Sequence, residues 1–240
     1  MPRHAQLNNV DHRDLRVVVE RGVTWGDAVM SALTFPAEFR DVQSRYPIVF
    51  QKAADGSLQP VALFGFEAGE NLFLDARGWE SGYVPMSIER QPFLIGLSAD
   101  GAPMVHIDLE HPRVGTDEGT PLFRPHGGTS EYLEYISGVL QTLHDGLRET
   151  PTFVEALLRH DLLESFVLDL ELDDGAQHRL AGYYTVHEER LAQLDAAALT
   201  SLHRDGHLQS IYMLVASLSQ FRDLIDRARK RGRAPVMVAM

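Results

Sequence analysis

YPIVFQKAADGSLQPVALFGFEAGENLFLDARGWESGYVPMSIERQPFLIG, residues Tyr46 to Gly96, is the densest run of strand-forming residues in the chain, and glycine-containing turns divide it. Pro47 restricts Tyr46 to an extended conformation, which starts a strand. Asp55-Gly56 then separates two apolar runs, residues 48–52 and 61–66. Asp-Gly between apolar runs is a strong hairpin signal, because tight hairpin turns need positive φ. The stretch therefore predicts an antiparallel hairpin and reads as the central sheet scaffold.

Two further Asp-Gly pairs repeat this signal elsewhere in the chain. They are Asp100-Gly101, between residues 93–97 and 104–109, and Asp174-Gly175, between residues 166–172 and 179–186. Three hairpins favour antiparallel pairing over a doubly wound parallel sheet. We therefore expect an α+β fold, with an antiparallel sheet built from several hairpins and packed by C-terminal helices.

The other segments complete this expected architecture. Strand-forming residues fill positions 15–20, and the aperiodic, proline-containing residues 110–128 predict a long surface loop. Apolar spacing and capping residues predict helices over residues 37–45, 130–148, 152–160, 187–193, 196–204 and 208–229. We expect one domain over residues 1–240, with a mobile N-terminus (about 1–12) and a mobile C-terminal tail (about 231–240).

Composition excludes several classes of function. The 240 residues contain 22 Lys and Arg against 34 Asp and Glu, a net charge of −12 that disfavours general binding to nucleic acid or anionic membranes. A local basic patch remains compatible with this charge. The chain has no cysteine, so disulfides, thiolate zinc sites and cysteine nucleophiles are excluded.

The distribution of apolar residues bears on location. Residues 1–15 have no apolar segment of signal-peptide length, and the longest apolar run, residues 211–216, is far shorter than the about 20 residues of a membrane-spanning helix. We therefore expect a soluble, cytoplasmic protein without membrane insertion.

The sharpest metal-like motif is His106-Ile107-Asp108. Residues i and i+2 of a strand share one face, so this imidazole and carboxylate could bind one ion, as in the facial triad of non-haem iron oxygenases. A third ligand would come from His160, His178 or His187. The simpler interpretation is a half-exposed strand with a polar face, and we favour it, expecting no metal and no cofactor.

Other candidate motifs lack essential parts. Residues 65–70 have two glycines but neither the lysine nor the hydroxyl of a phosphate loop, and no Gly-x-Ser-x-Gly nucleophile motif occurs. The basic residues 227–233 suit the C-terminus of a helix. The chain offers no convincing catalytic set, so we expect a protein that is not an enzyme.

One edge of the opening stretch is a candidate for ligand recognition. Trp79, Tyr83 and Arg90 gather there, with Trp79 between two glycines on an expected turn. An exposed tryptophan near an arginine can anchor a partner. The alternative is that Trp79 folds back over the edge of the sheet.

An ordered series of motifs resembles the SapC family of bacterial proteins. They are Tyr46-Pro-Ile-Val-Phe50, Pro60-Val-Ala-Leu-Phe64-Gly65, Gly69-Glu-Asn-Leu-Phe73, Tyr83-Val-Pro85, Arg90-x-Pro92-Phe93, Pro121-Leu-Phe123, Gly182-x-Tyr184, Glu189-x-Leu191 and Leu202-His-Arg204-x-Gly206-x-Leu208. The resemblance covers residues 35–227. It implies an association with surface-layer genes and with TonB-dependent receptors, and it supplies no catalytic residues.

The expected function follows from the resemblance and from the missing catalytic set. We expect a non-enzymatic accessory or binding protein of the envelope, surface layer or TonB-dependent nutrient uptake, with a possible protein partner. The alternative is an iron- and 2-oxoglutarate-dependent oxygenase using His106 and Asp108. The sequence defines no oligomeric state.

Overall fold

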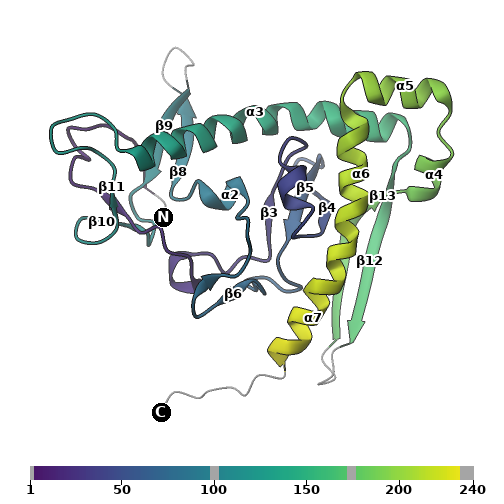
Figure 1. The fold of residues 1–240 in the computed structure, drawn as a ribbon, viewed down its shortest axis with the longest axis horizontal. Coiled ribbons are helices and arrows are strands. Elements are labelled where there is room, and N and C mark those ends of the chain that lie inside the picture. Colours follow the sequence, from purple (N-terminus) through teal and green to yellow (C-terminus); the bar gives the residue numbers. More distant parts are fainter. Residues whose placement is uncertain (1–2, 98–102, 172–176, 233–240) are drawn as a thin grey trace.

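A computed structural model of the chain describes residues 3–97, 103–171 and 177–232. Figure 1 shows an elongated molecule in which one long helix, α3 (Glu131–Arg159), spans two groups of strands. Antiparallel sheets and helices together confirm the α+β class.

The larger group is a five-stranded antiparallel sheet with the order β12-β13-β4-β5-β3. Its strands are β3 (Ser31–Leu33), β4 (Ile48–Lys52), β5 (Leu58–Leu63), β12 (Leu163–Glu171) and β13 (Gln177–Val186). The predicted hairpins β4–β5 and β12–β13 both belong to it. Gly56, in the β4–β5 turn, has the expected positive φ of 83°.

The third predicted hairpin lies in a separate sheet with the order β1-β9-β8. It joins β8 (Phe93–Leu97) to β9 (Pro103–Asp108), and β1 (His4–Gln6) pairs with the other edge of β9. Between β5 and β8 along the chain, β6 (Leu74–Asp75) and β7 (Gly78–Trp79) form a two-stranded antiparallel sheet. The 46–96 stretch therefore contributes to three sheets and is not one central scaffold. The turns at Asp100-Gly101 and Asp174-Gly175 lie outside the described residues.

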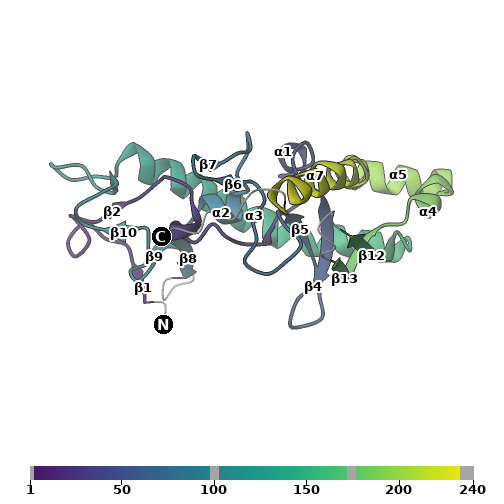
Figure 2. The same ribbon diagram turned by 90° about the horizontal axis from the view of Figure 1, so that it is seen from below.

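Helices from the C-terminal part of the chain cover one face of the five-stranded sheet, as expected. Figures 1 and 2 show α6 (His207–Ser217) and α7 (Phe221–Gly232) along β12 and β13. Phe221 stacks on Phe166 of β12 with ring centroids 5.1 Å apart. The shorter helices are α1 (Phe39–Val42), α2 (Met86–Glu89), α4 (Glu188–Ala192) and α5 (Ala196–Arg204).

Two hydrophobic cores lie along α3. Leu133, Ile136 and Leu140, from its first half, pack with Phe93 and Ile107 of the second sheet. Side chains from its second half, those of Phe153, Val154, Ala156 and Leu157, pack with the five-stranded sheet. The chain that we predicted to be one domain therefore has two hydrophobic cores, and helix α3 contributes to both.

The prediction of two helices over residues 130–148 and 152–160 is wrong, because α3 continues through Pro151. Proline inside a helix removes one hydrogen bond and crowds the preceding turn. Here Thr150 Oγ1 donates to the carbonyl oxygen of Gly146 (2.8 Å), and Phe153 and Leu157 are buried beyond the proline. Tertiary packing on both sides therefore outweighs the local preference for a break.

The last helix is also divided differently from the prediction of one helix over residues 208–229. A 3₁₀ turn, η2 (Leu218–Gln220), separates α6 from α7. Ser217 Oγ donates to the carbonyl oxygen of Leu214 (2.6 Å) and accepts from the backbone N–H of Ile48 (3.0 Å). A serine hydroxyl that donates to a carbonyl of the preceding helical turn often bends the helix. Here the same hydroxyl also connects the bent position to Ile48 of β4.

Residues 110–128 are not a loop without structure. They contain β10 (Val114–Gly115) and β11 (Thr120–Pro121), which flank β2 (Arg16–Val17) in a small antiparallel sheet. Gly119 has φ 98°, and a Cβ there would lie 2.5 Å from the Val17 carbonyl, so only glycine fits. The expected strand over residues 15–20 is limited to Arg16–Val17.

The chain ends differ in what the structure describes. The N-terminal segment, expected to be mobile over about residues 1–12, includes β1, which pairs with β9. Of the expected tail, residues 231–232 end α7, and residues 233–240 lie outside the described part. Among the helices of the described residues, none is both long and apolar enough to cross a membrane.

Two glycines of α3 provide a matched test of its packing. Gly146 is buried, and a Cβ there would lie 2.1 Å from Phe35, whereas Gly138 is exposed with no atom within 4 Å. We expect Gly146→Ala to lower the free energy of unfolding by about 1–3 kcal/mol through overpacking. Gly138→Ala should raise it by up to about 1 kcal/mol, because alanine is the better helix former. Urea unfolding of both variants measures the difference, and a stabilised Gly146→Ala would contradict the close packing.

Candidate functional site

Trp79 and Tyr83, predicted to form a recognition edge, lie around the buried ring of Tyr46. Trp79 is half-buried; its Nε1 donates to the Tyr46 hydroxyl (2.8 Å), and its ring packs edge-on against Phe64 at 5.2 Å. The Tyr46 hydroxyl in turn donates to the carbonyl oxygen of Tyr83. Burial raises the pKa of Tyr46 to about 12, so its hydroxyl stays a donor even at moderately alkaline pH. The aromatic residues of this edge thus contribute to the larger core.

Tyr83 also reaches a buried carboxyl group. Glu38, which is 1% exposed, accepts hydrogen bonds from the Tyr83 hydroxyl (2.8 Å), Thr34 Oγ1 (2.6 Å) and the backbone N–H of Met86 (2.6 Å). Burial raises the pKa of Glu38, and the three hydrogen bonds oppose that shift only in part. Glu38 therefore ties the start of α1 to the start of α2.

Arg90, the third predicted recognition residue, serves a different part of the fold. Its Nη1 donates to the carbonyl oxygen of Phe93 (2.6 Å), at the start of β8, and burial lowers the pKa of its guanidinium. Each of Trp79, Tyr83 and Arg90 thus has an internal partner. Their shared role in ligand recognition stays a prediction.

His106 and Asp108, the metal-like pair, lie on β9 with the strand geometry that the spacing predicts. His106 covers Gly96 of β8, where a Cβ would lie 2.3 Å from Nε2. Asp108 Oδ1 accepts from the backbone N–H groups of Arg3 (2.9 Å) and Glu110 (3.2 Å). These contacts are those of a polar strand face.

The third ligand of the expected alternative is not found in the described chain. Within residues 3–97, 103–171 and 177–232, no three histidine, aspartate or glutamate side chains lie close enough to share a metal ion. Of the suggested third ligands, His187 caps α4, and the side chain of His178 lies outside the described part. The oxygenase alternative thus lacks a metal site in these residues.

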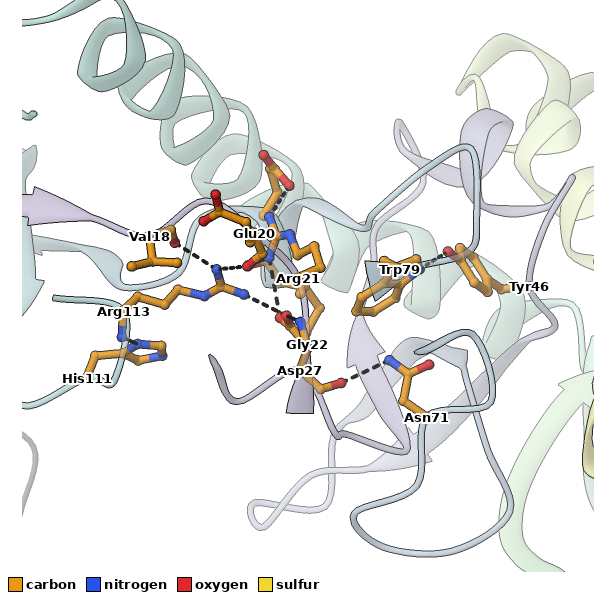
Figure 3. Close-up of polar contacts among 12 residues, drawn as sticks. Val18, Glu20, Arg21, Gly22, Asp27, Tyr46, Asn71, Trp79, His111 and Arg113 are labelled. Atoms are coloured by element: carbon orange, nitrogen blue, oxygen red, sulfur yellow. Dashed lines mark hydrogen bonds and ion pairs between the residues drawn. The ribbon is translucent and has the colours of Figure 1, made fainter. Parts of the chain in front are cut away.

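Asp27 and Arg113, which are almost fully buried, form an ion pair between the two cores that we call the junction pair (Figure 3). Arg113 Nη2 lies 2.6 Å from Asp27 Oδ2, and both side chains are at most 1% exposed. Arg113 Nη1 also donates to the carbonyl oxygens of Val18 (2.8 Å) and Glu20 (2.6 Å). Burial lowers the pKa of Arg113, and Asp27 opposes that shift.

Further contacts connect the junction pair to its surroundings. The backbone N–H of Gly22 donates to Asp27 Oδ2 (2.8 Å), and Asn71 Nδ2 donates to the Asp27 carbonyl oxygen (2.9 Å), as Figure 3 shows. Arg21 Nη1 lies 3.4 Å from Asp27 Oδ1, and its Nη2 pairs with Glu89 at the end of α2. Within the described part of the chain, the buried Arg113 Nε has no hydrogen-bond partner, whereas the other polar groups named here are paired. Because nearly all of its donors and acceptors have internal partners, we assign the network to folding.

An apolar hollow of 510 Å³ is the site best suited to a ligand, and we call it the α3–hairpin groove. It lies between the second half of α3, the β4–β5 hairpin and the end of β3. Its apolar wall consists of Leu33, Leu58, Pro60, Leu147, Pro151, Val154 and Leu158. Ligand pockets typically have about 300–1,000 Å³ and apolar walls with a few polar groups.

The polar groups of the groove differ in their availability. Thr34 and Thr150 direct their hydroxyl hydrogens to Glu38 and to the Gly146 carbonyl. Lys52 holds its ammonium 5.3 Å from the centre of the Tyr184 ring. Within the described part of the chain, neither Lys52 nor Glu155 belongs to an ion pair, and both line the groove. A ligand could therefore meet one cation and one anion.

Sequence reasoning missed this groove because its wall combines three distant segments. The one local signal is Pro151, which has no N–H for the carbonyl of Leu147 and exposes its own ring on α3. Leu158 is 54% exposed, yet it belongs to the same helical stripe as the groove residues. Only the docking of α3 on the hairpin shows that these residues face one hollow.

Comparison with known proteins supports the resemblance seen in the sequence. The family model of SapC matches residues 7–224. The chain belongs to the SapC family. No curated protein and no solved structure gives a significant match. The matched residues include those of the groove and the junction pair, and all of the buried core residues except Ala228.

The buried carboxyl group of Glu38 predicts a pH effect on stability. The pKa of Glu38 in the folded protein is raised above its ordinary value of 4.5, so in this pH range the folded state binds more protons than the unfolded state. The contribution of Glu38 to the free energy of unfolding therefore falls as pH rises from about 4.5 through the raised pKa. We expect Glu38→Gln to gain stability relative to the original protein over that interval. Urea unfolding across pH measures the difference, with the exposed Glu134→Gln as control. A constant difference between the original protein and Glu38→Gln would contradict the shift.

Removing one member of the junction pair should leave a buried, unpaired charge. We expect Asp27→Ala to lower the free energy of unfolding by about 3–5 kcal/mol. Asp169→Ala, which breaks a pair with Arg179 on the exposed face of β12, should change it little. Adding Arg113→Met to Asp27→Ala should recover part of the loss. Thermal and urea unfolding test this series, and equal effects of Asp27→Ala and Asp169→Ala would refute it.

Proposed function

We propose that this SapC-family chain is a non-enzymatic binding protein that holds a small amphipathic molecule in the α3–hairpin groove. The observation that carries the proposal is the apolar hollow of 510 Å³ bounded by α3 and the β4–β5 hairpin. Burial of an apolar ligand body there would contribute roughly 25 cal/mol for each Å² removed from water.

The unpaired charges of the groove suggest the chemistry of the ligand's polar end. Lys52 can receive a carboxylate or sulfonate, and Glu155 can accept hydrogen bonds from an amine or hydroxyl. The Tyr184 ring below the Lys52 ammonium helps to fix its position. A ligand with an apolar body and one charged end fits this arrangement.

The cellular role that we propose rests on the family. An accessory function in the envelope, in the surface layer or in TonB-dependent nutrient uptake, exercised from the cytoplasm with a protein partner, agrees with the resemblance. A binding role needs no catalytic set, and the internal pairing of the most buried charges agrees with that.

A fluorescent amphipathic probe tests the groove directly. 1-Anilinonaphthalene-8-sulfonate combines fused and single apolar rings with one sulfonate, which suits the groove and Lys52. We expect Leu158→Glu to weaken its binding at least tenfold, or about 1.4 kcal/mol, because a carboxylate would enter the apolar wall. Fluorescence titration measures both dissociation constants.

Tyr212→Glu is the matched control, because Tyr212 is equally exposed at 54% but lies on α6 away from the groove residues. It should bind the probe like the original protein. Equal weakening by both variants, or no effect of Leu158→Glu, would exclude the groove as the binding site.

Deletion of the gene, complemented with the original or the Leu158→Glu form, tests the cellular role through uptake of a TonB-dependent nutrient. Unimpaired uptake in the deletion strain would refute that role.

A further inference from the structure

We propose that a second site, beside the N-terminal end of α3, binds a small phosphorylated ligand through Arg13, Arg16 and Arg124. We call it the guanidinium pocket. It consists of two adjoining hollows of 480 Å³ and 310 Å³ that share Arg13, Phe123, Arg124 and Pro125 in their walls. The site is distinct from the groove in residues and in ligand chemistry, and its test does not depend on the groove.

The charge of this pocket is opposite to that of the chain. The whole protein carries −12, but the two hollows are lined by three arginines and His126. Asp14 is the one acidic side chain among the lining residues that the structure describes. A concave surface lined by one sign of charge concentrates ligands of the other sign. The pocket therefore selects an anion although the protein as a whole repels anions.

Two of the guanidinium groups are held in place by backbone oxygens. Arg16 lies on β2, and its Nη1 donates to the carbonyl oxygen of Gly119 (2.9 Å). Arg13 Nη2 donates to the carbonyl oxygen of Pro125 (3.4 Å). A guanidinium has five N–H donors, so most of them remain available to a ligand. Prior fixation lowers the entropy lost when the ligand binds.

A short turn that contains Gly127 and Gly128 positions Arg124. Its backbone N–H donates to the carbonyl oxygen of Gly128 (3.0 Å), and Gly127 and Gly128 both have positive φ. The Arg124 side chain lies 3.7 Å from Glu134 on α3, with both groups more than half exposed. That exposed pair is weak and is readily exchanged for a ligand phosphate.

The arrangement favours a phosphate group over a single carboxylate. Arginine binds phosphate oxygens through two parallel N–H donors, and a phosphate presents three oxygens to several such groups. The half-buried ring of Phe123 borders both hollows and offers a surface on which a planar group can stack. The pocket thus fits a phosphate with a planar ring attached, as in a nucleotide.

Calorimetric titration with inorganic pyrophosphate at low salt tests the proposal. We expect binding to the original protein that weakens with added salt, because charge contacts dominate. Arg124→Glu should weaken it at least tenfold. Glu134→Gln should strengthen it, since the competing carboxylate is removed, and a folding defect would not produce an increase.

Arg148→Glu is the matched control, because Arg148 is exposed on the same helix and does not line the pocket. It should leave the affinity unchanged. Absence of pyrophosphate binding, or equal losses of affinity in Arg124→Glu and Arg148→Glu, would overturn the proposal.

Adenosine diphosphate should bind more tightly than pyrophosphate if Phe123 stacks on its base, and Phe123→Ala should remove that gain in affinity. Sedimentation with phosphatidate vesicles but no binding of soluble pyrophosphate would also overturn it, in favour of a membrane surface.

Discussion

The ion pair between Asp27 and Arg113 is the contact on which the arrangement of the two cores depends. Both charges are removed from water, so each is tolerated only in the presence of the other. Asp27 also receives the Asn71 side chain on its carbonyl oxygen, and Arg113 holds the chain at Val18. Asn71 precedes Phe73 of the larger core, whereas Val18 follows Val17 of the smaller one. The buried pair therefore links the two cores at a second place besides the shared helix α3.

Local sequence signals predicted the hairpins but not the assignment of strands to sheets. Asp-Gly pairs specify a turn between neighbours, so pairing of β4 with β5, β8 with β9 and β12 with β13 followed from the chain itself. Pairing between strands that are distant in the sequence, such as β13 with β4, leaves no signal in the residues next to either strand. The same limit explains the helix errors, because the burial of Phe153 keeps α3 continuous and the bond between Ser217 and Ile48 interrupts the last helix.

Aromatic density in the sequence does not show which side chains have internal partners. Trp79 and Tyr83 were prominent in the sequence because they stand among glycines, but the structure gives their polar atoms partners in Tyr46 and Glu38. Composition identifies which side chains can bind a ligand, whereas only packing decides which ones are already occupied. The groove and the guanidinium pocket depend on less conspicuous residues, from segments that α3 brings together.

The length and continuity of α3 have a consequence for how two bound molecules would be related. Glu134, beside the guanidinium pocket, and Leu147, in the groove wall, are on one unbroken helix and lie about 20 Å apart at 1.5 Å per residue. A continuous helix keeps this distance nearly constant. Molecules bound at both sites would therefore be held at a fixed spacing, without the entropy cost of ordering a flexible linker. A partner that recognises both occupants would gain avidity from that spacing alone.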